Sequence, residues 1–303
     1  SVNSLLAGRN FKVKKEHIVI CNGAAELIKA IFAKLDLGRL GLIRPTFEEY
    51  PNRYMPEKCI VYSSEYVGFQ YTASDLMRYF TDNPIDTLVL INPDNPSGNY
   101  IKYTDLLLII DWAKKRKIQL IIDESFADFA EIEEGEKNTI IDEKVLTSYD
   151  KLYVVKSISK SYGVPGIRLG VLASSDEEII KTLKKEVSIW NINSFGEFFM
   201  QIYEKYEKEY KDSLKKIISA RKSFADKLEK IPYLRVIPSQ ANYIMCEVTE
   251  AMDCDVLAEK LLRQEILIKS LKNKVCDGKQ YIRLSVKTVQ ENNYLISCLE
   301  KIV

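Results

Sequence analysis

The chain has 303 residues, of which 46% are hydrophobic and 29% are charged, and its formal net charge is +1. This length is sufficient for one large domain with a smaller one, and a charge near zero gives no long-range attraction to nucleic acid or to an anionic membrane. No apolar run is long enough to cross a bilayer, and the six cysteines lack the close-pair spacing of metal sites, so we expect a cytoplasmic protein with reduced thiols and no metal.

The first predicted strand, residues 18–20, leads into an amphipathic helix through Asn22-Gly23-Ala24-Ala25. Backbone amides that open a helix after such a turn can bind an anion, although an ordinary strand-to-helix turn explains the glycine equally simply. His17, the only histidine, precedes this strand, and we expect it to contact solvent. A single histidine leaves no basis for a histidine-rich metal site.

Three further apolar runs, 88–91, 118–122 and 152–155, have strand length and end in polar residues. They lead into Asn-Pro-Asp-Asn-Pro-Ser-Gly at 92–98, into Asp-Glu-Ser-Phe at 123–126, and into a segment containing Lys160. Helices predicted over 105–117 and 177–188 can act as crossovers, so the pattern favours an α/β fold with a mostly parallel sheet between two helical layers. Ligands bind at the carboxyl ends of strands in such sheets, where these polar residues are expected to meet.

The segment 157–170, Ser-Ile-Ser-Lys-Ser-Tyr-Gly-Val-Pro-Gly-Ile-Arg-Leu-Gly, places Lys160 among small hydroxylated residues with Arg168 further along. A lysine that is desolvated beside a basic anion site has a lowered pKa and can form an imine with a carbonyl compound. The alternative is a surface lysine in a strand-to-turn connection.

Residues 194–230 predict one long, highly charged helical stretch that suits a connection between two domains. Beyond Pro232 the predicted order is strand, strand, helix, strand, helix, at 233–237, 243–248, 255–264, 281–286 and 290–302. We therefore divide the chain into a large domain (1–193), a linking helix (194–231) and a small α+β C-terminal domain (232–303).

Taken together, these motifs resemble the fold type I pyridoxal-phosphate enzymes of the class I/II aminotransferase family, and they are most similar to the branch that contains histidinol-phosphate aminotransferase and threonine-phosphate decarboxylase. The resemblance extends from about Ile18 to Leu284. It implies the three-layer PLP-dependent transferase fold, pyridoxal 5'-phosphate as cofactor, a small-molecule amino acid or amine substrate, and a homodimer.

The resemblance also implies roles for individual residues. Lys160 would form the imine and move a proton at the substrate's α-carbon, while Asp123 would keep the pyridine nitrogen protonated. Asn95 would donate to the ring's phenolic oxygen, and Phe47 would stack on the ring. The phosphate would be held by residues of two segments: Gly23, Ala24, Ala25, Ser157, Ser159 and Arg168.

For the substrate, Arg283 matches the arginine that binds the α-carboxylate in this family. Asn193 and Asn242 could reach the substrate as well, with a helix cap and a turn former as the competing explanations. The chain departs from the family at Phe126, which stands where a tyrosine usually donates a second hydrogen bond to the phenolic oxygen. It also begins at Ser1 without a methionine or the expected N-terminal arm, which predicts a fragment or one end of a fused polypeptide.

The implied activity is that of an aminotransferase acting through Lys160 on an amino acid or amine, with or without a phosphate group. Two alternatives stay open: a decarboxylase of the threonine-phosphate type, in which the carboxylate rather than the α-hydrogen lies perpendicular to the ring, and a non-catalytic domain derived from such an enzyme. The residue identities alone do not separate the two enzymatic alternatives.

Overall fold

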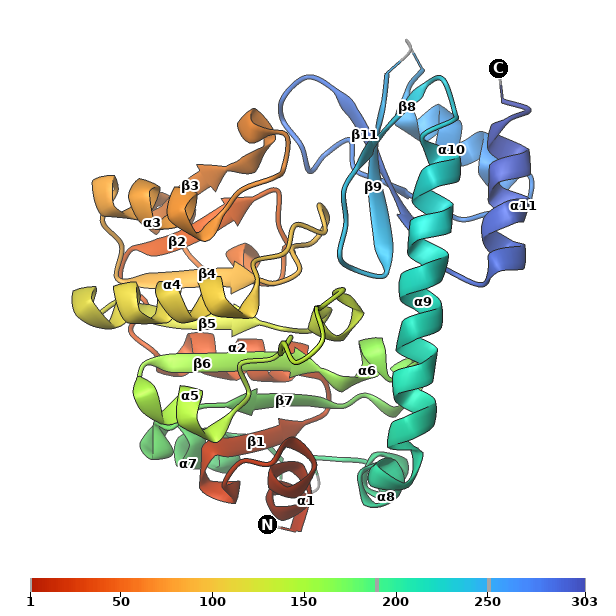
Figure 1. The fold of residues 1–303 in the computed structure, drawn as a ribbon. Helices are drawn as coiled ribbons and strands as arrows, with labels where there is room; N and C mark the ends of the chain where they lie inside the picture. Colours follow the sequence, from red (N-terminus) through yellow and green to blue (C-terminus); the bar gives the residue numbers. More distant parts are fainter. Residues whose placement is uncertain (1, 189–190, 250–251, 303) are drawn as a thin grey trace.

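Two β-sheets of different size organise the chain, and a long helix connects them (Figure 1). The computed structural model describes residues 2–188, 191–249 and 252–302. The seven-stranded sheet has the order β1-β7-β6-β5-β4-β2-β3, and the four-stranded sheet has the order β10-β11-β9-β8.

The large sheet is parallel across its centre and antiparallel at one edge. Neighbouring strands from β3 to β6 run parallel, whereas β7 is antiparallel to both β6 and β1. Ile91 pairs with Asp123, and Asp123 pairs with Val155, so β4, β5 and β6 end together as the sequence predicts. The strands are β1 (Ile18–Cys21), β2 (Leu40–Arg44), β3 (Cys59–Ser63), β4 (Thr87–Ile91), β5 (Gln119–Asp123), β6 (Leu152–Ser157) and β7 (Gly170–Ala173).

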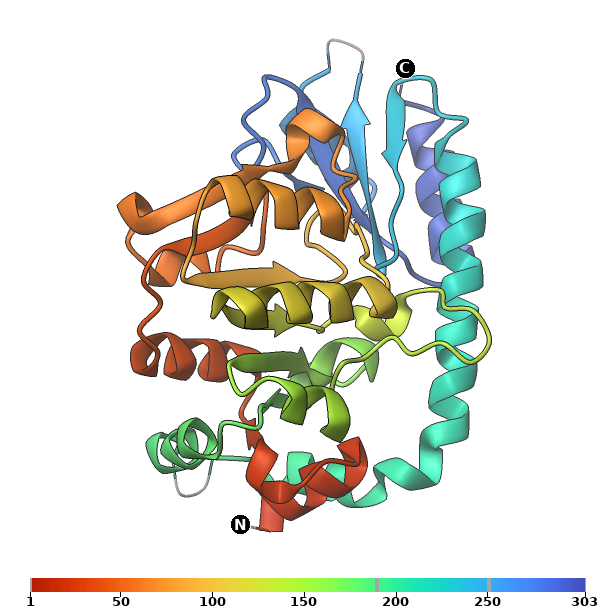
Figure 2. The ribbon, with the colours of Figure 1, turned by 60° about the vertical axis from the view of Figure 1, so that its left-hand side comes forward.

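Helices cover both faces of this sheet, which confirms the predicted three-layer α/β architecture (Figure 2). Alternation along each strand divides the core: in β5, Leu120 and Ile122 pack on one side and Ile121 on the other. The first side carries α1 (Val2–Phe11), α3 (Ala73–Asp82), α4 (Tyr103–Arg116) and α5 (Glu143–Ser148). The second side carries α2 (Ala24–Lys34) and α7 (Glu177–Glu186).

The predicted helical stretch 194–230 is two helices, so the expectation of one continuous helix is wrong. α8 (Ser194–Ile202) and α9 (Glu207–Leu228) are separated by a 3-10 turn at Tyr203–Tyr206. The sequence has no glycine or proline here, and the break coincides with an aromatic cluster in which Tyr203 lies 4.9 Å from the ring of Tyr162. Tertiary packing rather than local propensity therefore determines the bend.

The small sheet is antiparallel and carries helices α10 (Cys254–Leu262) and α11 (Val289–Leu299) together with the end of α9. Its strands are β8 (Leu234–Ile237), β9 (Tyr243–Val248), β10 (Lys269–Ser270) and β11 (Gln280–Ser285). The predicted order of elements is confirmed, with β10 added, because two residues are too short for a periodic pattern. The domain boundaries remain a prediction.

His17 is buried, so the expected solvent contact is wrong. Its Nδ1 lies 3.0 Å from a carboxylate oxygen of Glu143, and its Nε2 lies 3.5 Å from Glu177. The 3-10 turn that contains His17 packs against α7, the helix that carries Glu177. In the part of the chain that the structure describes, no helix combines the length and apolar character needed to cross a membrane.

Candidate active site

A pocket lies where β4, β5 and β6 end, beside the N-terminus of α2. Eight of the ten residues predicted to bind a cofactor line it: Ala24, Ala25, Phe47, Asn95, Asp123, Ser157, Lys160 and Arg168. The wall is completed by Ile28, Ile91, Ser125 and Phe126. Residues that are more than 140 positions apart in sequence therefore meet at one edge of the sheet, as parallel strand ends require.

The other two predicted residues lie next to the pocket lining. A Cβ atom on Gly23 would come within 2.8 Å of Nη2 of Arg168, so this glycine allows the arginine to approach the backbone. The Ser159 hydroxyl accepts a hydrogen bond from the backbone N–H of Leu169 (3.2 Å) and lies 3.4 Å from its carbonyl oxygen. The Ser159 hydroxyl thus contacts the backbone next to Arg168, outside the pocket lining. Its contact with a ligand remains a prediction.

Lys160 extends into this pocket from α6 (Ile158–Ser161), a single helical turn that directly follows β6. Partial burial lowers the pKa of the Lys160 ammonium, the positive charges of Arg283 and Arg168 lower it further, and Asp123 opposes them. Its Nζ lies 5.9 Å from the centre of the Phe126 ring. A lowered pKa increases the fraction of free amine at neutral pH, which is the form that attacks a carbonyl carbon.

Asp123, the last residue of β5, is buried and hydrogen-bonded on both oxygens. Oδ1 accepts from the backbone N–H of Ser125 (2.8 Å), and Oδ2 accepts from the hydroxyl of Tyr50 (2.8 Å). Burial raises the pKa of Asp123, although these hydrogen bonds oppose the change. Both of its hydrogen-bond donors are uncharged, and Asp123 lines the pocket, so a protonated ligand nitrogen would fit this position.

Tyr50 is a site residue that the sequence did not reveal. It is fully buried, and burial beside Asp123 raises its pKa well above the usual value, so it stays a neutral donor. Its ring meets Phe47 edge to face at 6.4 Å. The available signal was its position three residues after Phe47, but a tyrosine near another aromatic residue is usually part of a core.

The N-terminus of α2 forms a cradle suited to an anion. Gly23 has a φ of +99° and precedes Ala24 and Ala25, which open the helix and line the pocket. Amides of a first helical turn lack helical partners and can bind an anion. A Cβ atom on Gly170 in β7 would lie 2.3 Å from the backbone nitrogen of Ala24, so only glycine permits this close approach of strand and loop. With Arg168 and Ser157 alongside, the donor set matches a phosphate group, and together with Asp123 and Lys160 it fits pyridoxal phosphate.

Arg283 reaches this site from the small sheet. Its Nη1 donates to Oδ1 of Asn95 (2.6 Å), and its guanidinium lies 4.8 Å from the centre of the Tyr243 ring. Lys269 is its register partner on β10 and is exposed. Two cations therefore occupy paired positions on adjacent strands, and one of them, Arg283, contacts the pocket residue Asn95. The sequence had identified only Arg283.

The two predicted asparagines have backbone or capping roles. Asn193 accepts from the backbone N–H of Gly196 (2.9 Å) as the N-cap of α8, and its amide donates to the carbonyl of Ile167 (2.8 Å). The backbone carbonyl of Asn242 accepts from Val286 (2.9 Å). The helix cap occupies Oδ1 of Asn193, and the bond to Ile167 occupies its Nδ2. Substrate contacts by either residue remain predictions.

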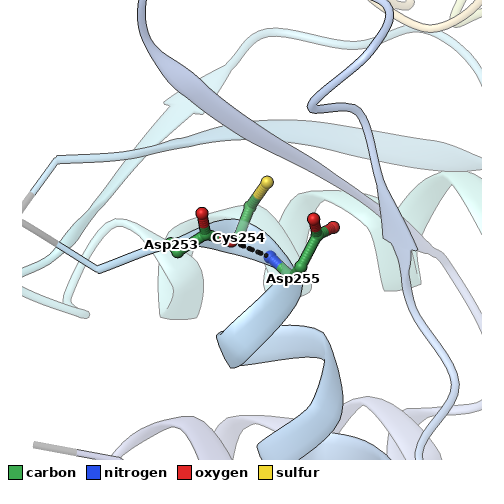
Figure 3. Close-up of side chains that lie close together, drawn as sticks. All are labelled: Asp253, Cys254 and Asp255. Atoms are coloured by element: carbon green, nitrogen blue, oxygen red, sulfur yellow. Dashed lines mark hydrogen bonds between the residues drawn. The ribbon is translucent and has the colours of Figure 1, made fainter.

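One group of potential metal ligands lies in the small domain, at the N-terminus of α10 (Figure 3). Asp253, Cys254 and Asp255 offer ligand atoms within 4.8 Å of one another. Lys272 forms an ion pair with both carboxylates, since its Nζ lies 2.5 Å from Asp253 and 3.4 Å from Asp255. Asp253 also caps the helix by accepting from the backbone N–H of Asp255 (2.8 Å), so we assign these carboxylates to capping and ion pairing.

Known proteins with similar sequences indicate one enzyme family. The family described as "Aminotransferase class I and II" matches residues 3–299. CMP-5'-(3-aminopropyl)phosphonate synthase from Streptomyces rubellomurinus is 32% identical over 292 residues, covering 96% of this chain and 45% of its own length. L-serine phosphate decarboxylase from Sulfurospirillum multivorans is 31% identical over 301 residues, covering 96% of this chain and 75% of its own length.

Solved structures agree with these relatives. The structure of a decarboxylase from Sulfurospirillum multivorans superposes with a TM-score of 0.89 at 27% identity, covering 99% of this chain and 86% of that chain. Further matches are named threonine-phosphate decarboxylase and histidinol-phosphate aminotransferase, which confirms the predicted branch. The chain spans less than half the length of the synthase that it matches.

Proposed function

We propose that this chain, which belongs to the class I and II aminotransferase family and uses pyridoxal phosphate, decarboxylates an amino acid that carries a phosphate or phosphonate group. The observation that supports this substrate class is Arg283, which contacts the pocket residue Asn95 and has Lys269 as its partner on the adjacent strand, while the pocket contains a separate phosphate cradle. An amino acid phosphate has two anionic groups a few bonds apart, and the two cations can bind one each.

The chain's own residues would hold the cofactor and handle the proton. Arg168, Ser157 and the amides of Ala24 and Ala25 would bind the phosphate, and Asp123 would keep a proton on the ring nitrogen. When bound, pyridoxal phosphate accepts the electron pair that remains on the substrate's α-carbon. Lys160 would then deliver a proton from Nζ to that carbon, so that loss of carbon dioxide leaves an amine product.

The orientation of the substrate determines which bond breaks. If Arg283 binds the phosphate, the carboxylate is free to lie perpendicular to the ring and leaves as carbon dioxide. If Arg283 binds the carboxylate, the α-hydrogen occupies that position and the reaction is a transamination. Two relatives carry the name L-serine phosphate decarboxylase, which favours the first arrangement.

An aminotransferase is the second candidate, supported by relatives named histidinol-phosphate aminotransferase. Phe126 is compatible with both reactions, because it packs edge to face on Tyr243 at 5.1 Å and has no group that could select between them. A non-catalytic domain is disfavoured by the intact set of Lys160, Asp123 and Asn95 in one pocket. The homodimer, the cytoplasmic location and a fused further domain remain proposals.

The test is an assay of both products. The purified chain with pyridoxal phosphate is incubated with O-phospho-L-serine, O-phospho-L-threonine or 2-amino-4-phosphonobutanoate, with and without 2-oxoglutarate, and carbon dioxide and glutamate are measured. We expect carbon dioxide without a need for 2-oxoglutarate, and we expect Lys160→Ala to reduce its release by at least about 1000-fold. Lys181→Ala, at an exposed lysine on α7, is the matched control and should retain full activity. Glutamate formation without carbon dioxide would establish the aminotransferase instead.

A further inference from the structure

A buried polar cluster behind the pocket is centred on Asp128, in the short 3-10 turn Ala127–Phe129 that follows β5. Its Oδ1 accepts from the ammonium of Lys156 (2.7 Å). Its Oδ2 accepts from the hydroxyls of Ser161 (2.7 Å) and Tyr210 (2.8 Å). One carboxylate therefore joins the consecutive elements β6 and α6 to the distant helix α9.

The charge of this carboxylate is maintained in spite of its burial. The side chain of Asp128 is 13% exposed and that of Lys156 is 3% exposed. Burial alone would raise the pKa of Asp128, but the Lys156 ammonium and the two hydroxyl donors outweigh burial and lower it. Glu124 is the other buried carboxylate near Lys156; it accepts from Thr139 and from the backbone of Ile140, and burial raises its pKa to about 7. Asp128 is thus the ionised partner of Lys156 at neutral pH.

The hydrogen bonds of Asp128 end at the residue next to Lys160. Ser161 directly follows Lys160 in α6, and the following ring, Tyr162, stacks on Tyr210 of α9 at 4.3 Å with an interplanar angle of 7°. The turn that carries Lys160 is therefore linked to α9 through the Asp128 carboxylate, which accepts from both Ser161 and Tyr210, and through the aromatic stack. A single helical turn has little stability of its own, so such external contacts determine where it lies.

The same helix is attached to the residue after Asp128. Arg221 of α9 is buried, and its Nη1 donates to the carbonyls of Phe129 (2.6 Å) and Ala241 (3.1 Å). Ala241 precedes β9, which is paired with the strand that carries Arg283. The turn 127–129 thus has fixed contacts with α6 on one side and with α9 and the small domain on the other, as the proximity of α6 to α9 in Figure 1 illustrates.

We propose that Asp128 is a positioning residue for Lys160: its carboxylate holds α6 against α9 through Ser161 and Tyr210, and so fixes the direction in which the lysine amine enters the pocket. This inference rests on the proposed role of Lys160 in holding the cofactor. A purely structural ion pair would support folding alone. A positioning residue also changes the accessibility and reactivity of the amine and the rate of the chemical step, because small displacements of a reacting group are costly.

The test compares Asp128→Asn, Ser161→Ala and Tyr210→Phe with Glu131→Gln. The control removes one charge from the ion pair between Glu131 and Lys222, which also joins the loop after β5 to α9 but is exposed and makes no contact with α6. Lys160 is labelled with an amine-reactive reagent between pH 6 and 11 before the cofactor is added, and the labelled peptides are quantified by mass spectrometry. Unfolding temperature, kcat and KM with the best substrate are measured in parallel.

For Asp128→Asn we expect a labelling profile of Lys160 that differs from the native profile, a kcat lower by about 10- to 100-fold, and a KM within about threefold. Ser161→Ala should change the labelling profile of Lys160 and kcat in the same direction by a smaller factor, without loss of the fold. If Asp128→Asn does not fold, Ser161→Ala is the variant that tests the inference. The combination of Ser161→Ala and Tyr210→Phe should be non-additive, because both act through one carboxylate. Glu131→Gln should match the native chain.

Native labelling and native kcat in both Asp128→Asn and Ser161→Ala would overturn the inference, even if the unfolding temperature falls. Failure of the proposed function would be recognised separately in the native chain. In that case pyridoxal phosphate would not protect Lys160 from the reagent, whatever the Asp128 variants do.

Discussion

At the scale of single residues, the site brings together buried carboxylates in different protonation environments. Asp123 lines the pocket and accepts from the uncharged donors Tyr50 and Ser125, whereas Asp128 is stabilised as an anion by Lys156. Asp94, in the loop after β4, is different, because its hydrogen-bond donors are the Ser97 hydroxyl (2.6 Å) and neighbouring backbone amides. Burial raises the pKa of Asp94 to about 7, against weaker opposing effects that include the charge of Lys274.

The raised pKa of Asp94 predicts a stability that depends on pH. A carboxyl group whose pKa is higher in the folded than in the unfolded state stabilises the fold at low pH, and this contribution is lost as the pH rises through about 7. Asp94→Asn should therefore have a free energy of unfolding that is higher than the native value by about 1–4 kcal/mol at pH 8. The difference should shrink toward pH 4. Urea unfolding at both pH values measures it.

Asp86→Asn is a suitable control, because that carboxylate is exposed and near Arg39. It should change stability little and without this pH dependence. An Asp94→Asn variant that is less stable than the native chain at pH 8 would contradict the expectation, since it would mean that the ionised carboxylate is favoured in the fold.

At the scale of elements, the junction of β1 and α2 determines the anion cradle. Gly23 combines a φ of +99° with a side-chain position that Arg168 already occupies, at 2.8 Å. Gly135 has a similar φ of +86°, but no atom lies within 4 Å of the position that a methyl group on it would occupy. A substitution at Gly135 therefore reports only the energetic cost of the backbone conformation, whereas a substitution at Gly23 adds the cost of displacing Arg168.

Gly23→Ala should reduce the affinity for pyridoxal phosphate by at least about tenfold, because displacing Arg168 removes a charge-assisted contact. Gly135→Ala should leave the affinity unchanged. Both variants should lose about 1 kcal/mol of stability from the left-handed conformation. Fluorescence titration with the cofactor and thermal unfolding provide the two measurements. Equal cofactor affinities for Gly23→Ala and the native chain would argue against this cradle as the phosphate site.

Elements with a strong apolar pattern could be predicted from the sequence, whereas features that depend on tertiary packing could not. The strands at 88–91, 118–122 and 152–155 are buried on both sides and therefore appear as continuous apolar runs. The break at Tyr203 arises from contacts with Tyr162 and Tyr210, which no local pattern encodes.

The same distinction holds for the site. Lys160, Asp123 and Asn95 could be identified because each belongs to a short, ordered motif after a strand. Tyr50 is joined to Asp123 only by folding, across 73 positions of sequence, and Asp128 is joined to Ser161, the neighbour of Lys160, across 33 positions. Lys269 was missed because its significance comes from its register with Arg283 in a two-residue strand.

At the scale of the whole molecule, the pocket depends on both sheets. The large sheet supplies the lysine, the aspartate and the anion cradle, and the small domain contributes Arg283 through its hydrogen bond to Asn95. Tyr243 strengthens this junction, since its hydroxyl donates to the backbone carbonyl of Asp94 (2.7 Å). A substrate that binds Arg283 would therefore connect the two parts of the chain next to Lys160.

The most direct test of the role assigned to Lys160 is to identify the residue that carries the cofactor. The chain loaded with pyridoxal phosphate is reduced with borohydride, digested, and mapped by mass spectrometry, with Lys156→Arg as a control for the neighbouring buried lysine. We expect the reduced cofactor on the peptide containing Lys160, on Lys160 itself, in the native chain and in the control. Attachment at another lysine, or no stable attachment while Lys160 remains unmodified, would contradict that role.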